Sequence, residues 1–221
     1  MRFLLVLLFG ILLGVLLVNS AQAKTLRIAV LDTGYSGPIT HLCATGHYDF
    51  TTFTPTVGLD TIGHGTTVTR AIEQYAGDKD FCILVFKVFG QEQVATLIIS
   101  AMLQAVASNA NVMNLSFEGG NPLAPEQEAL TYALIKHLSV FVAAGNASKD
   151  LNAKCDVYPA CYNVKGLHVI SGKPLHDAKT GNTGKAVTEV QDYCYADLCG
   201  TSLSTAIATG KFVNKTGDKK P

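Results

Sequence analysis

Hydrophobic and polar positions follow one another along the chain in blocks that predict strands and helices in alternation. Short runs rich in apolar and β-branched residues predict buried strands at residues 26–31, 81–88, 110–116, 140–144 and 167–171. Longer segments with helical character predict helices at residues 64–75, 91–108, 125–137 and 202–213. In the second of these helices the side chains expected to face a core are Val94, Leu97, Ile98, Ala101, Leu103 and Ala105.

This order of elements predicts an α/β fold. Strands that are apolar on both faces and separated by helices are typical of a mostly parallel sheet covered on both sides, a three-layer sandwich. In such sheets the functional site lies at the carboxyl ends of the strands. We find no internal repeat or linker, so residues 24–213 are expected to form one domain, followed by a flexible tail over residues 214–221.

The first 23 residues have the pattern of a secretory signal peptide. Arg2 precedes an unbroken apolar run over residues 3–18, and the segment ends in Ala21-Gln-Ala23. A membrane anchor is the alternative, but the run is shorter than the roughly 20 residues that span a bilayer. We expect cleavage after Ala23 and a secreted or periplasmic protein.

Cysteines and charge narrow the functional classes. An even number of cysteines in an exported chain predicts disulfides, whereas a metal site would call for a Cys-x-x-Cys pair, which is absent. The two short spacings suggest local bridges, which leaves the first two cysteines for each other: Cys155–Cys161, Cys194–Cys199 and Cys43–Cys82. Without Arg2 the chain has 16 basic and 17 acidic residues and no basic patch. Binding to nucleic acid, or to a membrane after signal cleavage, therefore has no electrostatic support.

Four polar residues stand at the ends of predicted elements and together suggest acyl transfer. Asp32 lies in "VLDTG", His64 in "GHGTTVTRA", Asn146 at the end of "VFVAAGN" and Ser202 in "CGTSLSTAIATG". A serine hydroxyl needs a base to become a nucleophile, and a histidine oriented by a carboxylate can serve. The Asn146 amide and the Ser202 backbone N–H can stabilise the negative charge that develops on a carbonyl oxygen.

A second chemistry also uses an Asp-Thr-Gly turn, namely the paired aspartates that activate water. It needs two carboxylates at one site. The chain has no second Asp-Thr-Gly, and Asp60-Thr-Ile-Gly contains an inserted residue. Taken singly, each of the four residues has a simpler interpretation as a turn or helix-cap residue. A Ser–His–Asp triad with an oxyanion donor accounts for all four together, which paired aspartates do not.

These segments resemble the subtilisin-like serine proteases, or subtilases, over residues 26–210, with the three catalytic segments in that family's order. The resemblance implies a secreted serine endopeptidase that cleaves peptide or protein substrates through an acyl-enzyme. It assigns catalysis to Asp32, His64 and Ser202, and the oxyanion hole to Asn146 and Ser202. It also implies that substrate lies along two segments, with residues Leu115, Ser116, Phe117, Glu118, Gly119, Ala143, Ala144 and Gly145.

The chain also departs from the family pattern. Lys24 leads straight toward the first strand, where subtilases usually carry a folding prosegment, and only 19 residues follow Ser202. The resemblance then implies a separate inhibitor or chaperone, or the disulfides, in place of the prosegment. No cofactor is expected for the chemistry and no metal ligands are assigned. Structural calcium is common in the family, but no aspartate cluster places it here. A non-catalytic subtilase-like binding protein and an esterase with the same triad remain the alternatives.

Overall fold

The computed structural model describes residues 25–38, 40–90, 95–172, 181–190, 194–195 and 198–218. The expected signal peptide lies outside these residues. Among the helices that the structure describes, none combines the length with the apolar composition needed to cross a membrane.

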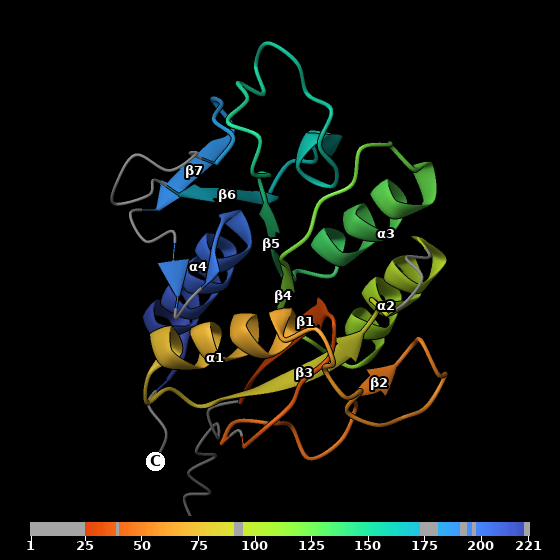
Figure 1. Cartoon of the computed structure of the whole chain (residues 1–221). Coiled ribbons are helices and arrows are strands. Elements are labelled where there is room, and N and C mark those ends of the chain that lie inside the picture. Colours follow the sequence, from red (N-terminus) through yellow and green to blue (C-terminus); the bar gives the residue numbers. More distant parts are fainter. Residues whose placement is uncertain are drawn as a thin grey trace, which may run out of the picture.

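A seven-stranded sheet forms the middle of the molecule, and every neighbouring pair of its strands is parallel (Figure 1). Its strand order is β2-β3-β1-β4-β5-β6-β7. The strands are β1 Leu26–Asp32, β2 Tyr48–Asp49, β3 Phe81–Lys87, β4 Val112–Leu115, β5 Ser139–Ala143, β6 His168–Gly172 and β7 Val187–Val190. An antiparallel hairpin of β8 (Cys194–Tyr195) and β9 (Leu198–Cys199) precedes the last helix.

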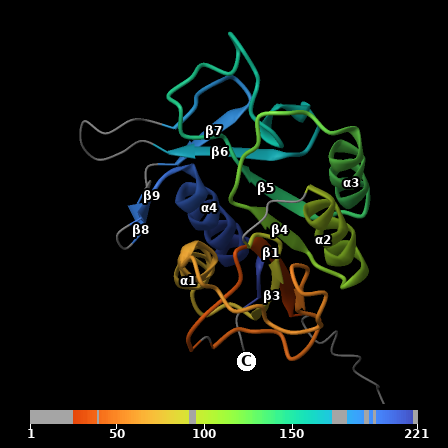
Figure 2. The same ribbon diagram turned by 45° about the vertical axis from the view of Figure 1, so that its right-hand side comes forward.

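Helices cover both faces of the sheet, two on each side, as Figures 1 and 2 show. Helices α1 (His64–Ala76) and α4 (Thr201–Thr216) pack together on one face, and α2 (Ala95–Ala107) and α3 (Ala124–Ile135) lie on the other. Successive residues of β1 supply both cores: Ile28 points toward α1 and α4, and Ala29 toward α2 and α3. The predicted α/β sandwich is thereby confirmed. A short 3₁₀ turn, Ala160–Tyr162, lies between β5 and β6.

All five predicted strands and all four predicted helices are present, and the ends that the structure describes differ by at most three residues. The strands missing from the prediction are β2, β7, β8 and β9. None of them exceeds four residues, which is too short to give a period-2 pattern. They form through pairing with neighbours that are distant in sequence.

Two details of the predicted helices are wrong. Leu103 is 45% exposed, whereas Met102 is fully buried in its place, because the inward stripe of α2 passes through Ala101, Met102 and Ala105. Val94 lies outside the described residues. Helix α4 continues past residue 213 to Thr216, because the side chain of Asn214 donates a hydrogen bond to the carbonyl of Ala76 at 3.1 Å. Residues 214–216 are therefore helical rather than part of a tail.

The six cysteines form three disulfides with the expected pairing. Cys43–Cys82 joins the segment before β2 to β3 across a separation of 39 residues. The other two close loops of 6 and 5 residues. Cys194–Cys199 ties β8 to β9 directly before Gly200, where α4 begins.

The long-range bridge should contribute more stability than a local one, because it restricts a longer loop of the unfolded chain. Loop closure predicts a loss of about 4 kcal/mol for Cys43→Ala/Cys82→Ala and of about 2 kcal/mol for Cys155→Ala/Cys161→Ala. Urea unfolding under non-reducing conditions measures both. Equal losses would contradict the loop-closure account.

Candidate active site

The site begins with a hydrogen bond between the last residue of β1 and the first residue of α1. His64 Nδ1 lies 2.8 Å from Asp32 Oδ1, and Asp32 is only 2% exposed. Helix α1 can approach the strand this closely because residue 65 is glycine: a Cβ there would collide with the carbonyl oxygen of Gly34. The "HGT" segment thus brings the imidazole onto the carboxylate.

This hydrogen bond fixes the tautomer of His64. An ionised carboxylate only accepts hydrogen bonds, so Nδ1 carries the proton and Nε2 of the neutral ring has a free lone pair. Asp32 Oδ1 also accepts from the Thr33 N–H at 2.7 Å, while Oδ2 is buried and accepts from no described residue. Burial alone would lower the pKa of His64, but the hydrogen bond and charge of Asp32 and the charge of Asp60 raise it.

Asp60 is an organising residue of the site that sequence analysis missed. Its Oδ1 accepts from the N–H groups of Ile62 and Gly63, and its Oδ2 accepts from the backbone and hydroxyl of Thr66. It therefore satisfies N–H groups at the start of α1 that have no partner within the helix. Burial alone would raise the pKa of Asp60, but these hydrogen bonds outweigh it and lower the pKa.

The link between Asp60 and β1 runs through Thr33. The Thr33 hydroxyl donates to Asp60 Oδ1 at 2.9 Å and accepts from the Gly65 N–H at 2.8 Å. An aspartate four residues before a helix start is a sequence signal for such a role, because acidic groups stabilise helix N-termini. In the sequence, Asp60 stands out only as part of Asp60-Thr-Ile-Gly, which is not an Asp-Thr-Gly turn.

Ser202 stands in the first turn of α4, and its hydroxyl is engaged by the segment that follows β4. Ser202 Oγ donates to the carbonyl of Ser116 at 2.7 Å, and Ser116 Oγ donates to the carbonyl of Ser202 at 2.9 Å. No hydrogen bond joins Ser202 to His64 in the described part of the chain. The structure thus brings Asp32 and His64 into contact and holds the serine hydroxyl on a different acceptor.

Strand register places Ser116 next to Asp32. Leu31 of β1 pairs with Leu115 of β4, so the residues that follow each of them, Asp32 and Ser116, leave the sheet side by side. Ser202 is bonded to Ser116, and it therefore lies at the same edge of the sheet as the Asp32–His64 pair.

A series of hydrogen bonds between buried polar side chains connects Ser116 of this arrangement to helix α4. Asn114 donates to Ser116 Oγ at 2.8 Å and accepts from the Thr209 hydroxyl at 3.0 Å, and all three residues are at most 1% exposed. Thr209 lies seven residues after Ser202, on the same face of α4. An asparagine inside the apolar run "VMNLS" was the available sequence signal, because a buried amide needs partners.

The side chain of Asn146 is oriented by the start of α4. The backbone N–H of Thr201 donates to Asn146 Oδ1 at 2.8 Å, and the Thr201 hydroxyl lies 3.2 Å from the same oxygen. A backbone N–H only donates, so the atom facing it must be the amide oxygen and Nδ2 occupies the opposite branch. Asn146 is exposed, and the loop that carries it is fixed to the residue before Ser202.

Asn182 braces the loop around Asn146 and is a second residue that sequence analysis missed. It is fully buried, donates to the carbonyl of Ala144 at 2.8 Å, and accepts from the N–H groups of Ala147 and Lys149. The segment around Asn182 carries no pattern that distinguishes it from an ordinary polar loop. Its role depends on a long-range contact.

The expected substrate segments are only partly accessible to a peptide. Leu115 is fully buried and pairs with β1 and β5, and Ala143 and Ala144 are buried too. Gly119 exchanges two backbone hydrogen bonds with Tyr158, at 2.7 and 2.8 Å. Its N–H is therefore not available to a peptide. Ser116 is buried and its carbonyl accepts from Ser202, so the stretch that remains for main-chain pairing is 117–118.

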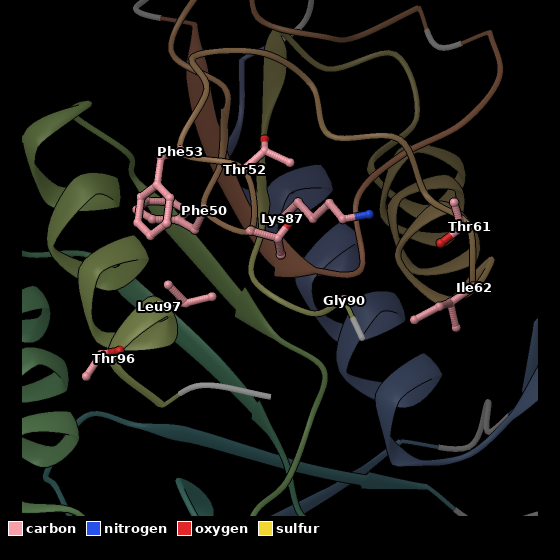
Figure 3. A pocket seen from close by; sticks show the side chains of 10 residues that line it. Phe50, Thr52, Phe53, Thr61, Ile62, Lys87, Gly90, Thr96 and Leu97 are labelled. Atoms are coloured by element: carbon pink, nitrogen blue, oxygen red, sulfur yellow. The ribbon is translucent and has the colours of Figure 1, made fainter. Parts of the chain in front are cut away.

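A cavity of about 780 Å³ opens beside the segment that leads to His64 (Figure 3). Thr61 and Ile62 lie on one side, and Phe50, Phe53 and Leu97 lie on the other. None of the candidate catalytic side chains lines it. Phe53 and Ile62 are 69% and 61% exposed, so apolar side chains are accessible here beside threonines and Lys87.

Comparison with solved structures decides the fold family. A lanthipeptide protease superposes with a TM-score of 0.68 at 17% identity, covering 88% of this chain and 76% of that one. A cold-adapted subtilisin-like serine proteinase gives 0.67 at 21%, covering 87% and 76%. The nisin leader peptidase NisP from Lactococcus lactis gives 0.67 at 14%, covering 86% and 77%.

The chain has the subtilisin-like fold. No protein-family model and no curated protein sequence matches it. The likeness therefore rests on three-dimensional structure. Within the described residues of this subtilisin-like chain, no group of three or more His, Cys, Asp or Glu side chains is placed to hold a metal ion.

Removing the charge of Asp60 should lower the pKa of His64 and loosen the start of α1. We expect Asp60→Asn to reduce the free energy of unfolding by about 2 kcal/mol at pH 7, because an amide cannot replace both acceptor oxygens. The native pKa of Asp60 lies below 3.8, so the difference should vanish as pH falls through that pKa and the wild-type carboxylate protonates.

NMR titration of the His64 ring tests the electrostatic part. The wild-type pKa should lie above 6.5, and Asp60→Asn should bring it down. The matched control is Asp78→Asn, which removes an exposed carboxylate beyond the other end of α1. If both variants shift the His64 pKa equally, then Asp60 has no specific effect on His64.

Proposed function

We propose that this chain is a serine endopeptidase that cleaves peptide bonds with Asp32, His64 and Ser202. The observation that carries the proposal is the 2.8 Å hydrogen bond from His64 Nδ1 to Asp32 Oδ1 at the carboxyl edge of a parallel sheet. It is supported by the Ser202 hydroxyl at the same edge and by the subtilisin-like fold.

In the first step His64 Nε2 accepts the hydroxyl proton of Ser202 while the serine oxygen attacks the peptide carbonyl. Asp32 stabilises the imidazolium that forms, which its buried carboxylate is suited to do. His64 then gives the proton to the departing amine. Water then attacks the acyl-serine while His64 accepts its proton. His64 returns the proton to the serine oxygen as the acid is released.

Two hydrogen-bond donors stabilise the negative charge on the carbonyl oxygen, and both lie next to Thr201. One is Asn146 Nδ2, and the other is the backbone N–H of Ser202 in the first turn of α4. Support for this assignment comes from the amide orientation that Thr201 imposes on Asn146.

The bond from Ser202 to the carbonyl of Ser116 represents the resting position of the nucleophile. In this mechanism the hydroxyl turns from this acceptor to His64 by rotation of the Ser202 side chain, a motion that takes picoseconds to nanoseconds in accessible residues. Catalytic hydrogen bonds often form fully only when substrate is bound. In this mechanism, the approach of a peptide accompanies the rotation.

The same bond to Ser116 favours a second candidate, a non-catalytic peptide-binding protein, because the serine is not activated in this arrangement. An esterase would use the same acyl transfer and differs only in the substrate. For the endopeptidase, the fold neighbours named as leader-peptide proteases suggest a peptide substrate. The three disulfides favour an exported protein, and a separate inhibitor or chaperone is the partner we propose to restrain it.

Replacing Ser202 by alanine should abolish peptide hydrolysis, with a loss of about 10⁶ in kcat. Wild-type protein should be labelled covalently by a fluorophosphonate, and Ser202→Ala should not be. Ser204→Ala is the control, because Ser204 is fully buried two residues further along α4. An unlabelled wild-type protein with a native circular dichroism spectrum would favour the binding protein.

Removing the Asn146 amide should slow the chemistry without weakening binding. The oxyanion exists only during reaction, so Asn146→Ala should lower kcat by about 10²–10³ and leave KM nearly unchanged. Steady-state kinetics on a peptide substrate separates the two constants. An unchanged kcat would refute the oxyanion-hole assignment.

A further inference from the structure

The Cys194–Cys199 disulfide lies at the surface, directly before the turn that leads to Ser202. Of the three disulfides it is the one in which both cysteines are exposed. In the other two, Cys43 is buried at 5% exposure and Cys161 is half-buried. Figure 2 shows the hairpin that carries the exposed bridge beside α4, at the rim of the molecule. A thiol in solution therefore reaches this bridge more readily than the other two.

The hairpin itself depends on this bridge. Its described part has two residue pairs, Cys194 with Cys199 and Tyr195 with Leu198. A two-stranded hairpin is at best marginally stable on its own. Tyr195 of β8 packs against the core beside α4, whereas Leu198 of β9 is 39% exposed. The disulfide spans the first of the two pairs, so β9 is held in place mainly through it.

The end of the hairpin influences the orientation of one peptide group at the site. Gly200 follows Cys199 and has a φ of 147°, a conformation that favours glycine. Because a glycine backbone is permissive, the chain before it helps to fix the peptide that joins Gly200 to Thr201. The N–H of that peptide donates to Asn146 Oδ1 at 2.8 Å. Release of β9 would therefore disturb the hydrogen bond that orients Asn146, the proposed oxyanion donor.

We infer that Cys194–Cys199 is a redox-modification site through which a dithiol switches the peptidase off. One thiolate of the dithiol attacks a sulfur of the bridge, the S–S bond breaks, and the other cysteine leaves as a thiolate that takes up a proton. The second thiolate of the dithiol then attacks the mixed disulfide and releases the remaining cysteine, which is protonated as well. The dithiol is thereby oxidised to its disulfide, and the two cysteines gain two electrons and two protons.

The reverse exchange switches the peptidase on. In the exported chain proposed above, the bridge forms where oxidised dithiols or disulfides accept the two electrons. The oxyanion hole is then completed in the oxidising compartment, and the peptidase is restrained while its surroundings are reducing. This inference deepens the proposed function and rests on it for the effect on activity.

Selective reduction tests the accessibility of the bridge. The folded protein is incubated with dithiothreitol without denaturant, the new thiols are blocked with iodoacetamide, and mass spectrometry locates them. We expect Cys194 and Cys199 to be alkylated about 10-fold faster than the cysteines of the other two bridges, because exposed disulfides are the labile ones. Equal rates for the three bridges, or slower opening of Cys194–Cys199, would overturn the inference.

The rate of fluorophosphonate labelling and kcat on a peptide test the effect on Ser202. Both should fall about 10- to 100-fold on reduction and recover with oxidised glutathione, because complete loss of an oxyanion donor costs about 10²–10³. Cys194→Ser/Cys199→Ser should have the low rates from the start and should not respond to dithiothreitol. The control, Cys155→Ser/Cys161→Ser, should behave like the wild type in both redox states.

Full activity of Cys194→Ser/Cys199→Ser would overturn the inference. If this variant does not fold, the wild-type protein with that bridge alone reduced gives the same comparison. Unchanged activity of this reduced protein would overturn the inference in the same way.

Hydrogen exchange at the Thr201 N–H detects the change without requiring catalysis. Reduction should raise its exchange rate about 10-fold and leave exchange in β1 unchanged, because only the hairpin end is released. Faster exchange at Thr201 in a protein that is never labelled would overturn the peptidase and support the redox-sensitive contact. Rapid labelling of Ser202 in both redox states would overturn the switch and leave the peptidase intact.

Discussion

The parallel pairing of β1 with β4 is the constraint on which the site depends. It sets Asp32 and Ser116 side by side where the two strands end. Helix α1 then places His64 against Asp32, and helix α4 places Ser202 against Ser116. In a parallel sheet every strand has its carboxyl end at the same edge, so residues distant in sequence meet there without any special connection.

Buried polar groups keep these elements in place, because each group bonds to residues outside its own segment. Asp60 joins the turn after β1 to the start of α1, Asn114 joins β4 to α4, and Asn182 joins two loops around Asn146. An unpaired polar group in a protein interior is costly, so such a group favours the one arrangement that satisfies it. The hydrophobic cores hold the layers together, and these polar contacts fix how the site is aligned within them.

Sequence patterns predict the central elements and the candidate catalytic residues, but they do not predict the contacts that align them. The strands around Leu31, Phe86 and Val142 are short apolar runs, and the polar residues that follow such runs are visible as candidates. The bracing roles of Asp60 and Asn182 were not predicted, because they depend on partners that the fold brings close. The acceptor of the Ser202 hydroxyl was also not predictable, because a rotamer is chosen by its surroundings. The family resemblance likewise assigns Gly119 to the substrate, whereas its backbone is bonded to Tyr158.

If the proposed function holds, the short stretch between Leu115 and Gly119 limits where a peptide can pair with the protein. Leu115 is enclosed by neighbouring strands, Ser116 is buried with its carbonyl bonded to the Ser202 hydroxyl, and Gly119 is bonded to Tyr158. Only Phe117 and Glu118 therefore lie between the engaged positions. A long edge strand lets a peptide slip by two residues and pair again, since side chains then face the same way. Here a slip of two residues would leave none paired, so a peptide would occupy a single frame. The choice of bond would then be set by side chains close to that bond rather than by the length of the peptide.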